Sequence, residues 1–214
     1  MDGDEDERFA RLLEQMRGRY DNSDPGHDFL HIERVLGSAR RIGDSVGAEL
    51  RIVLPAALLH DVVNVPKNHP DRVLASQKAA AAAQAILGEA GYDAAEIEKI
   101  GIVITEHSYS LGKAPSCIES AVLQDSDRLD ALGALGIMRM VTCGALMGSR
   151  YYDEQEPVPQ TRALDDKRNT IDHLYVKLYK LAGTMNTPLG REEAARRTAF
   201  MQAFMVELDT ELRT

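Results

Sequence analysis

Three short segments of this chain place histidine and aspartate beside apolar residues. His60 and Asp61 adjoin each other in VLPAALLHDVV, His31 comes about one helix earlier, and Asp127 follows in QDSDRLDALGALG. Burying such ionisable groups is costly unless they are paired or bound to a cation. Two imidazoles with two carboxylates suit six-coordinate Mn²⁺, Fe²⁺, Co²⁺ or Ni²⁺, and they suit a closed structural zinc site poorly. The sequence therefore predicts a divalent metal site.

The residues alone leave the last carboxylate ligand open, because Asp125, Asp127 and Asp130 lie close together. Asp127 and Asp130 share a helix face at i,i+3 spacing, and Asp130 could instead orient a ligand histidine or cap a turn. A single histidine on an apolar face is more often a hydrogen-bonded core residue. The prediction therefore depends on the ordered series of His, His-Asp and Asp.

Helices are predicted to carry these side chains, because apolar residues recur at helical spacing. The positions are Ile32, Val35, Ala39, Ile42 and Val46 in one segment, and Ile97, Ile100 and Ile104 in another. Neighbouring residues on a helix point about 100° apart, so His60 and Asp61 can flank one point while Leu58 and Val62 face the core. This pattern predicts an all-α fold.

Helix starts are indicated at three places by capping residues and proline. They are Pro70–Asp71, a capping box formed by Ser116 and Glu119, and Thr187–Pro188. The last of these opens a helix with Phe200, Phe204 and Leu208 at i+4 intervals. Short joints separate the segments, and the longest, 148–160, is expected to be a solvated connection or a mobile flap.

Composition fits one globular chain of 214 residues with 44% hydrophobic and 28% charged residues. The length predicts a single helical domain over 1–214, with a core over roughly 20–135 and a C-terminal helical extension over roughly 136–214. A net charge of −9 argues against a nucleic acid polymer as partner. Neither a secretory signal nor an apolar run of about 20 residues is visible, so we expect a cytoplasmic protein without a membrane partner. A homo-oligomer is possible.

Four segments together resemble a known family: HDFLHIERV, AALLHDVVNVPK, TEHSYS and LQDSDRLDALGALGI. They are similar to the HD-domain metal-dependent phosphohydrolases of the bacterial YedJ/YpgQ-like branch, and the likeness extends over roughly residues 20–210. The resemblance implies a compact all-α HD-domain helical bundle with His31, His60, Asp61 and Asp127 as metal ligands. Asp127 is selected because the family's last ligand precedes Arg-Leu. Mn²⁺ is the favoured cofactor, with Fe²⁺, Co²⁺, Ni²⁺ or Mg²⁺ as alternatives.

Polar side chains near the ligands are candidates for phosphate binding. Asn64 comes one turn after His60, Lys67 follows in NVPK, and Arg72 opens the next segment. They resemble the basic segment that follows His-Asp in this branch, and could hold phosphoryl oxygens. Arg72 could equally be an exposed cation at a helix start.

Four further residues have more than one interpretation. His107, in TEHSYS, could hydrogen-bond the substrate, protonate a leaving oxygen or support a ligand. Arg128 could reach phosphate, or it could form a structural ion pair with Asp125 or Glu119. His27 and Asp28 match the branch pattern and are read as cleft-wall residues or as supports for a ligand.

The resemblance implies hydrolysis of phosphoester or phosphoanhydride bonds, with nucleotides as favoured substrates. A divalent cation lowers the pKa of its bound water, and the sequence contains neither a GxxxxGK[ST] nor a GxSxG motif. We therefore expect nucleoside triphosphate pyrophosphohydrolysis by a metal-activated water, with Asp61, His107 and Lys67 as catalytic residues. The alternatives are a nucleotide monophosphatase or phosphodiesterase, an HD-type di-iron oxygenase and a catalytically silent nucleotide-binding regulator.

Overall fold

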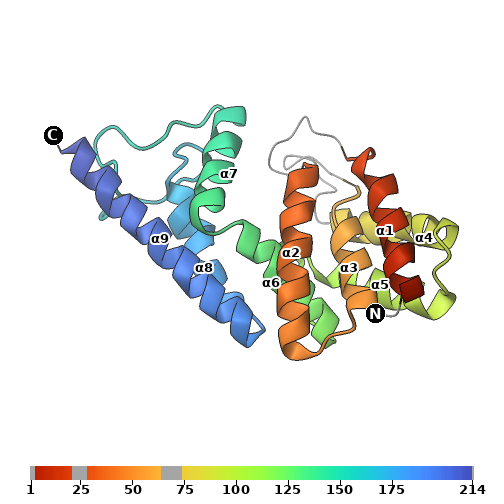
Figure 1. Ribbon diagram of the computed structural model, residues 1–214. Coiled ribbons are helices and arrows are strands. Elements are labelled where there is room, and N and C mark those ends of the chain that lie inside the picture. Colours follow the sequence, from red (N-terminus) through yellow and green to blue (C-terminus); the bar gives the residue numbers. More distant parts are fainter. Residues whose placement is uncertain (1–2, 21–27, 64–73, 214) are drawn as a thin grey trace. The chain divides into compact units, whose positions relative to one another are not determined.

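A computed structural model describes residues 3–20, 28–63 and 74–213 of the chain. Every element in these ranges is a helix, and they contain no strand beyond an isolated bridge between Arg150 and Asn169 (Figure 1). The predicted all-α fold is therefore confirmed. The chain divides into two compact units, the first ending at Asp127 and the second beginning at Arg128. Within the described ranges, no single helix is long and apolar enough to cross a membrane.

The first unit consists of helices that pack around α3. The helices are α1 (Gly3–Arg17), α2 (Phe29–Val46), α3 (Leu50–Leu59), α4 (Ala75–Glu89), α5 (Ala94–Glu106), the 3₁₀ turn η2 (Tyr109–Leu111) and α6 (Ile118–Asp130), whose last three residues belong to the second unit. Helix α3 contacts α1, α2, α4 and α5, and its residues from Ile52 to Leu59 are buried. Its C-terminus is therefore fixed deep inside this unit, where His60 and Asp61 follow it.

Local capping determines where α2 begins and ends. The carboxylate of Asp28 accepts a hydrogen bond from the backbone N–H of His31 at 2.9 Å, which makes Asp28 the N-cap of α2. Gly47 ends the helix with a positive φ of 68°. Asp28 was expected to line a cleft or support a ligand, and it fixes the helix turn that carries His31. His27 lies outside the described residues.

The capping box predicted at the start of α6 is wrong. The N–H and hydroxyl of Ser116 both donate to the Glu106 carboxylate at 3.0 Å, while Glu119 accepts the backbone N–H of Glu49. Both side chains therefore bind other elements, although a helix does start nearby, at Ile118. The predicted start at Pro70–Asp71 lies outside the described residues.

The second unit is built on two long helices. Its elements are α7 (Gly133–Leu146), the π-helix η3 (Leu174–Leu178), α8 (Tyr179–Leu181), η4 (Ala182–Thr184) and α9 (Pro188–Leu212). Helices α7 and α9 lie side by side (Figure 1). Thr187 caps α9 as predicted, by accepting the N–H of Gly190 at 3.1 Å.

The buried face of α9 differs from the one that the phenylalanine spacing suggested. Phe200 is 51% exposed, whereas Met201 and Met205 are buried together with Ala194 and Gly190. Small residues allow close approach at one end of this face, and flexible methionine side chains fill the space at the other.

An internal polar network holds the segment between α7 and η3. Asp172 is fully buried and accepts both guanidinium nitrogens of Arg162 at 2.6 Å, as well as the N–H of Asp165 at 2.8 Å. Burial would raise the pKa of Asp172, but these donors lower it overall. These contacts order the part of the segment that follows residue 160. None of residues 148–160 is buried, which agrees with the expected solvated connection, and the alternative of a mobile flap stays a prediction.

Candidate metal centre

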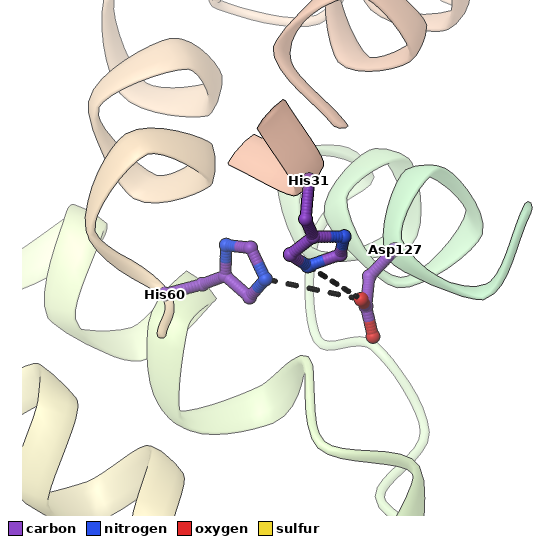
Figure 2. Close-up of side chains that lie close together, drawn as sticks. All are labelled: His31, His60 and Asp127. Atoms are coloured by element: carbon purple, nitrogen blue, oxygen red, sulfur yellow. Dashed lines mark ion pairs between the residues drawn. The ribbon is translucent and has the colours of Figure 1, made fainter. Parts of the chain in front are cut away.

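His31 and His60 come from neighbouring helices and point toward each other inside the first unit. His31 lies in the first turn of α2 and is fully buried, and His60 follows the last residue of α3 with 1% of its surface exposed. Their ring centroids are 5.4 Å apart, edge to face. Figure 2 shows both rings directed toward Asp127, which lies on α6. Three helices therefore bring these side chains together.

A backbone contact fixes the orientation of the His60 ring. Its Nδ1 lies 2.8 Å from the carbonyl oxygen of Ala57, which can only accept, so Nδ1 carries the hydrogen. The neutral ring then presents the lone pair of Nε2 to the cluster. Nε2 is buried, and it has no hydrogen-bond partner among the described residues. An imidazole held by a carbonyl in this way is the usual arrangement of a metal ligand.

The two histidines each face both predicted carboxylate ligands. His31 Nε2 lies 3.6 Å from Asp127 Oδ1 and 3.9 Å from Asp61 Oδ2, and the corresponding distances from His60 Nε2 are 3.8 and 3.7 Å. Ligand atoms about 2.1 Å from a shared ion lie between about 3 Å apart when adjacent and about 4.2 Å apart when opposite. All four separations fall within that range. Among the described residues, one atom each from His31, His60 and Asp127 lie within 4.8 Å of one another, as do atoms of His60, Asp61 and His107, so two overlapping groups could hold a cation.

The electrostatics of Asp127 also favour a charged ligand. Burial alone would raise its pKa, but His60, His31 and His107 outweigh this effect and lower it overall. The carboxylate is therefore ionised at neutral pH, as a metal ligand must be.

His107 joins this cluster from α5. It is 7% exposed, its Nδ1 lies 2.6 Å from the Ile104 carbonyl, and its ring meets that of His60 edge to face at 4.9 Å. Its Nε2 is 3.9 Å from Asp61 Oδ1, whereas Asp61 Oδ2 faces His31 and His60. Burial, together with His60, lowers the pKa of His107. The ring is therefore neutral and presents the Nε2 lone pair toward Asp61.

Asp127 is the aspartate that the structure brings to the histidines. Asp130 pairs instead with Arg139 in the second unit. Asp125 is fully buried and, in the described part of the chain, is not among the residues grouped around the histidines. Geometry therefore supports the choice that the resemblance made.

The predicted phosphate-binding residues are placed only in part. Arg128 is 7% exposed, and its Nη1 donates to the Thr184 carbonyl at 2.7 Å, so this nitrogen supports the second unit. Asn64, Lys67 and Arg72 lie outside the described residues. Their roles in phosphate binding stay predictions, as does that of Arg128.

Gln124 supports the site and was not anticipated from the sequence. Its side-chain amide donates to the carbonyls of Glu106 and Lys113, at 2.8 and 3.0 Å. These two contacts hold the segment that begins at His107 against α6. A glutamine inside the apolar run AVLQ is the only sequence feature that could have drawn attention to it.

Comparison with known proteins agrees with this geometry. The sequence model of the HD domain family matches residues 29–132, which include all four candidate ligands and His107. YpgQ of Bacillus subtilis is 33% identical over 191 residues, covering 87% of this chain and 85% of YpgQ. The chain belongs to the HD-domain family.

Solved structures support the same assignment across the whole chain. The crystal structure of B. subtilis YpgQ in complex with ADP has a TM-score of 0.75 at 30% identity, covering 97% of this chain and 96% of YpgQ. An HD-superfamily hydrolase from Bacillus thuringiensis has a TM-score of 0.74 at 29% identity, covering 98% and 99%. The expectation of an HD-superfamily enzyme, a metal-dependent phosphohydrolase, is thus confirmed at the level of the family.

Proposed function

We propose that this HD-domain protein hydrolyses nucleotides, and that it converts nucleoside triphosphates to monophosphates and pyrophosphate. The observation that supports the proposal is that His31 and His60 both face Asp127 and Asp61, which we propose as the four metal ligands. A divalent cation held there, with Mn²⁺ favoured, would lower the pKa of water and neutralise charge on a phosphoryl oxygen. The protein's contribution is to keep the ligand nitrogens and oxygens oriented before the substrate arrives.

We propose that His107 accepts a proton from the attacking water. Its Nδ1 is engaged by the Ile104 carbonyl, so a neutral ring offers only a lone pair at Nε2. This geometry favours a general base over the donor to a leaving oxygen that the sequence also allowed. Asp61 Oδ1, 3.9 Å away, would stabilise the imidazolium that forms.

Nucleotide specificity is supported by the relative that binds ADP. The phosphates of YpgQ's ligand and of the proposed substrates are alike, and the two chains align over almost their full lengths. In this protein, Asn64, Lys67 and Arg72 follow the His-Asp pair in the sequence, and we propose that they contact the phosphates.

A product analysis tests the proposal. The protein would be stripped of metal, reloaded with Mn²⁺ or Co²⁺, and incubated with nucleoside tri-, di- and monophosphates and a generic phosphodiester. Pyrophosphate release from triphosphates is expected. Release of inorganic phosphate would instead identify a nucleotidase, and no turnover of any substrate by the metal-loaded protein would overturn the hydrolase assignment.

A pair of variants tests whether turnover depends on the candidate metal ligands. Asp127→Asn removes a ligand charge with little change in shape, and it should lose at least about 100-fold in Mn²⁺ affinity together with activity. Asp44→Asn makes the same chemical change at an exposed position of α2 and should behave like the wild type. Equal metal binding by both variants would exclude Asp127 as a ligand.

A further inference from the structure

The C-terminal end of α3 is held by side-chain hydrogen bonds at two successive carbonyls. His60 Nδ1 donates to Ala57, as described above, and the hydroxyl of Tyr20 donates to the carbonyl of Leu58. The next carbonyl, that of Leu59, accepts the N–H of Val62 at 3.2 Å. The last carbonyls of a helix lack partners within the helix, so buried ones need such donors. Tyr20 supplies one of them from outside α3.

Tyr20 also contacts the start of the helix that carries His31. Its ring lies 5.8 Å from that of Phe29, centroid to centroid, and Phe29 is the first residue of α2. The guanidinium of Arg17 lies 5.1 Å from the centroid of the Phe29 ring. Tyr20 is only 9% exposed. One buried side chain thus touches the beginning of one ligand helix and the end of another.

We propose that Tyr20 is a positioning residue for the metal centre. Its hydroxyl fixes the last turn of α3, and this turn determines where His60 and Asp61 point relative to His31. The inference rests on the proposed metal-dependent function. It assigns Tyr20 no contact with substrate, because the hydroxyl hydrogen is engaged by the Leu58 carbonyl.

The environment of Tyr20 keeps this donor available. Burial, and to a smaller extent the charge of Asp61, raises the pKa of the Tyr20 hydroxyl, which therefore stays protonated at neutral pH. A tyrosine in an ordinary core needs only some partner for its hydroxyl. Here the partner is a main-chain oxygen two residues before a metal ligand, and this placement gives the contact a function beyond packing.

Tyr20→Phe tests the proposal by removing the hydroxyl and keeping the ring. We would titrate metal-free protein with Mn²⁺, following free and bound ion by electron paramagnetic resonance, and measure kcat and KM for a nucleoside triphosphate. We expect the Kd for Mn²⁺ to rise about tenfold, because partners that orient metal ligands typically contribute 10- to 100-fold. The spectrum of the bound ion should broaden, and kcat should fall more than KM rises.

Tyr92→Phe is the matched control. Tyr92 is 6% exposed in the same unit, and its ring lies 3.9 Å from the guanidinium of Arg8. Loss of either hydroxyl can lower the melting temperature, but only Tyr20→Phe should change the Kd and the spectrum of Mn²⁺. A Tyr20→Phe protein with wild-type Mn²⁺ binding and spectrum would overturn the inference.

A second variant and the wild-type titration cover the remaining outcomes. If Tyr20→Phe does not fold, Phe29→Leu serves as a second variant, because it weakens the packing of the Tyr20 ring while keeping the Tyr20 hydroxyl. We expect a smaller rise in the Kd for Mn²⁺ in this variant. Unchanged Mn²⁺ binding in a folded Phe29→Leu protein would then count against the inference. If the wild type itself binds no Mn²⁺, the proposed function fails, which differs from the case in which wild type and variant bind equally.

Discussion

His60 and His107 are held in the same way, although they follow different helices. In each, Nδ1 meets the carbonyl three residues earlier, and Nε2 approaches one oxygen of Asp61. The two oxygens of Asp61 thereby separate two tasks, one facing the ligand set and the other facing His107. An aspartate directly after His60 can therefore face the ligand histidines with one oxygen and His107 with the other.

His107→Gln tests that division of tasks. His107 faces Asp61 Oδ1, whereas Oδ2 faces the ligand histidines. Loss of the His107 imidazole should therefore leave metal binding unchanged and remove a proton acceptor. We expect kcat to fall roughly 10²- to 10⁴-fold, with Mn²⁺ stoichiometry unchanged. His173→Gln is the control, since His173 is half-buried beside Asp166 in the second unit. Loss of Mn²⁺ from His107→Gln would show instead that His107 is a ligand.

The candidate metal ligands could be selected from the sequence because their residue types are unusual in apolar helices. His31, His60 and Asp61 follow from that contrast, whereas Asp127 needed either the family resemblance or the structure to separate it from Asp125 and Asp130. Tyr20 could not be found in this way. Its partner is a main-chain oxygen 38 residues away, and no residue type marks such a contact.

At the scale of elements, Gln124 joins α6 to the segment that begins at His107. Gln124→Leu would leave the Glu106 and Lys113 carbonyls without this donor, at a cost of about 1–3 kcal/mol in the free energy of unfolding. Urea denaturation measures this loss. Gln84→Leu, at an exposed position of α4, should change it by less than about 0.5 kcal/mol. Equal effects would show that the amide does not hold the segment.

The segment between α7 and η3 should respond to acid through Glu156. The N–H groups of Thr161 and Gln160 donate to its carboxylate and lower its pKa from about 4.5 to about 2. A lowered pKa means that the stabilisation is complete above about pH 4.5 and is lost as the pH falls toward 2.

The measurement is the difference in urea midpoint between the wild type and Glu156→Gln across this pH range. The wild type should be the more stable protein at neutral pH, and the difference should shrink as the carboxylate is protonated. A difference that stays constant with pH would contradict the hydrogen bonds to the ionised carboxylate. A carbon-13 titration of the Glu156 carboxyl group gives the pKa directly.

Element positions followed from the sequence better than element faces did. The periodicity of apolar residues identified α2, α5 and α9, because a repeat of 3.6 residues is a property of the helix itself and does not depend on its neighbours. Which face of α9 is buried depends on its neighbours: Arg197 lies on the Met201 side and donates to the Leu129 carbonyl at 2.6 Å. A Cβ on Gly133 would come within 3.2 Å of the Arg197 side chain, so this packing depends on a glycine far away in the sequence.

For the whole molecule, the net charge of −9 has to be reconciled with the proposed anionic substrate. A bound cation reverses the sign of the potential locally, because its charge is the largest in the site. If nucleotides are the substrates, metal-free protein should therefore bind them weakly. Under the proposed function, the four candidate ligands would thus control both chemistry and recognition.

We also propose that the two units unfold together, as the sequence suggested when it predicted a single domain. Helix α6 runs without a break from Ile118 to Asp130, and the division between the units falls after Asp127. Melting the first unit would therefore disrupt the helix that begins the second. Calorimetry of the full chain should show one transition.

Metal should shift that single transition. At a Mn²⁺ concentration about 100-fold above the Kd, binding adds about 2.7 kcal/mol to the free energy of unfolding. For a chain of this length this corresponds to an increase of about 5–10 °C in Tm. Asp127→Asn should lose the increase, since it removes a ligand. Two transitions, of which Mn²⁺ moves only one, would show that the units unfold independently and that α6 does not couple them.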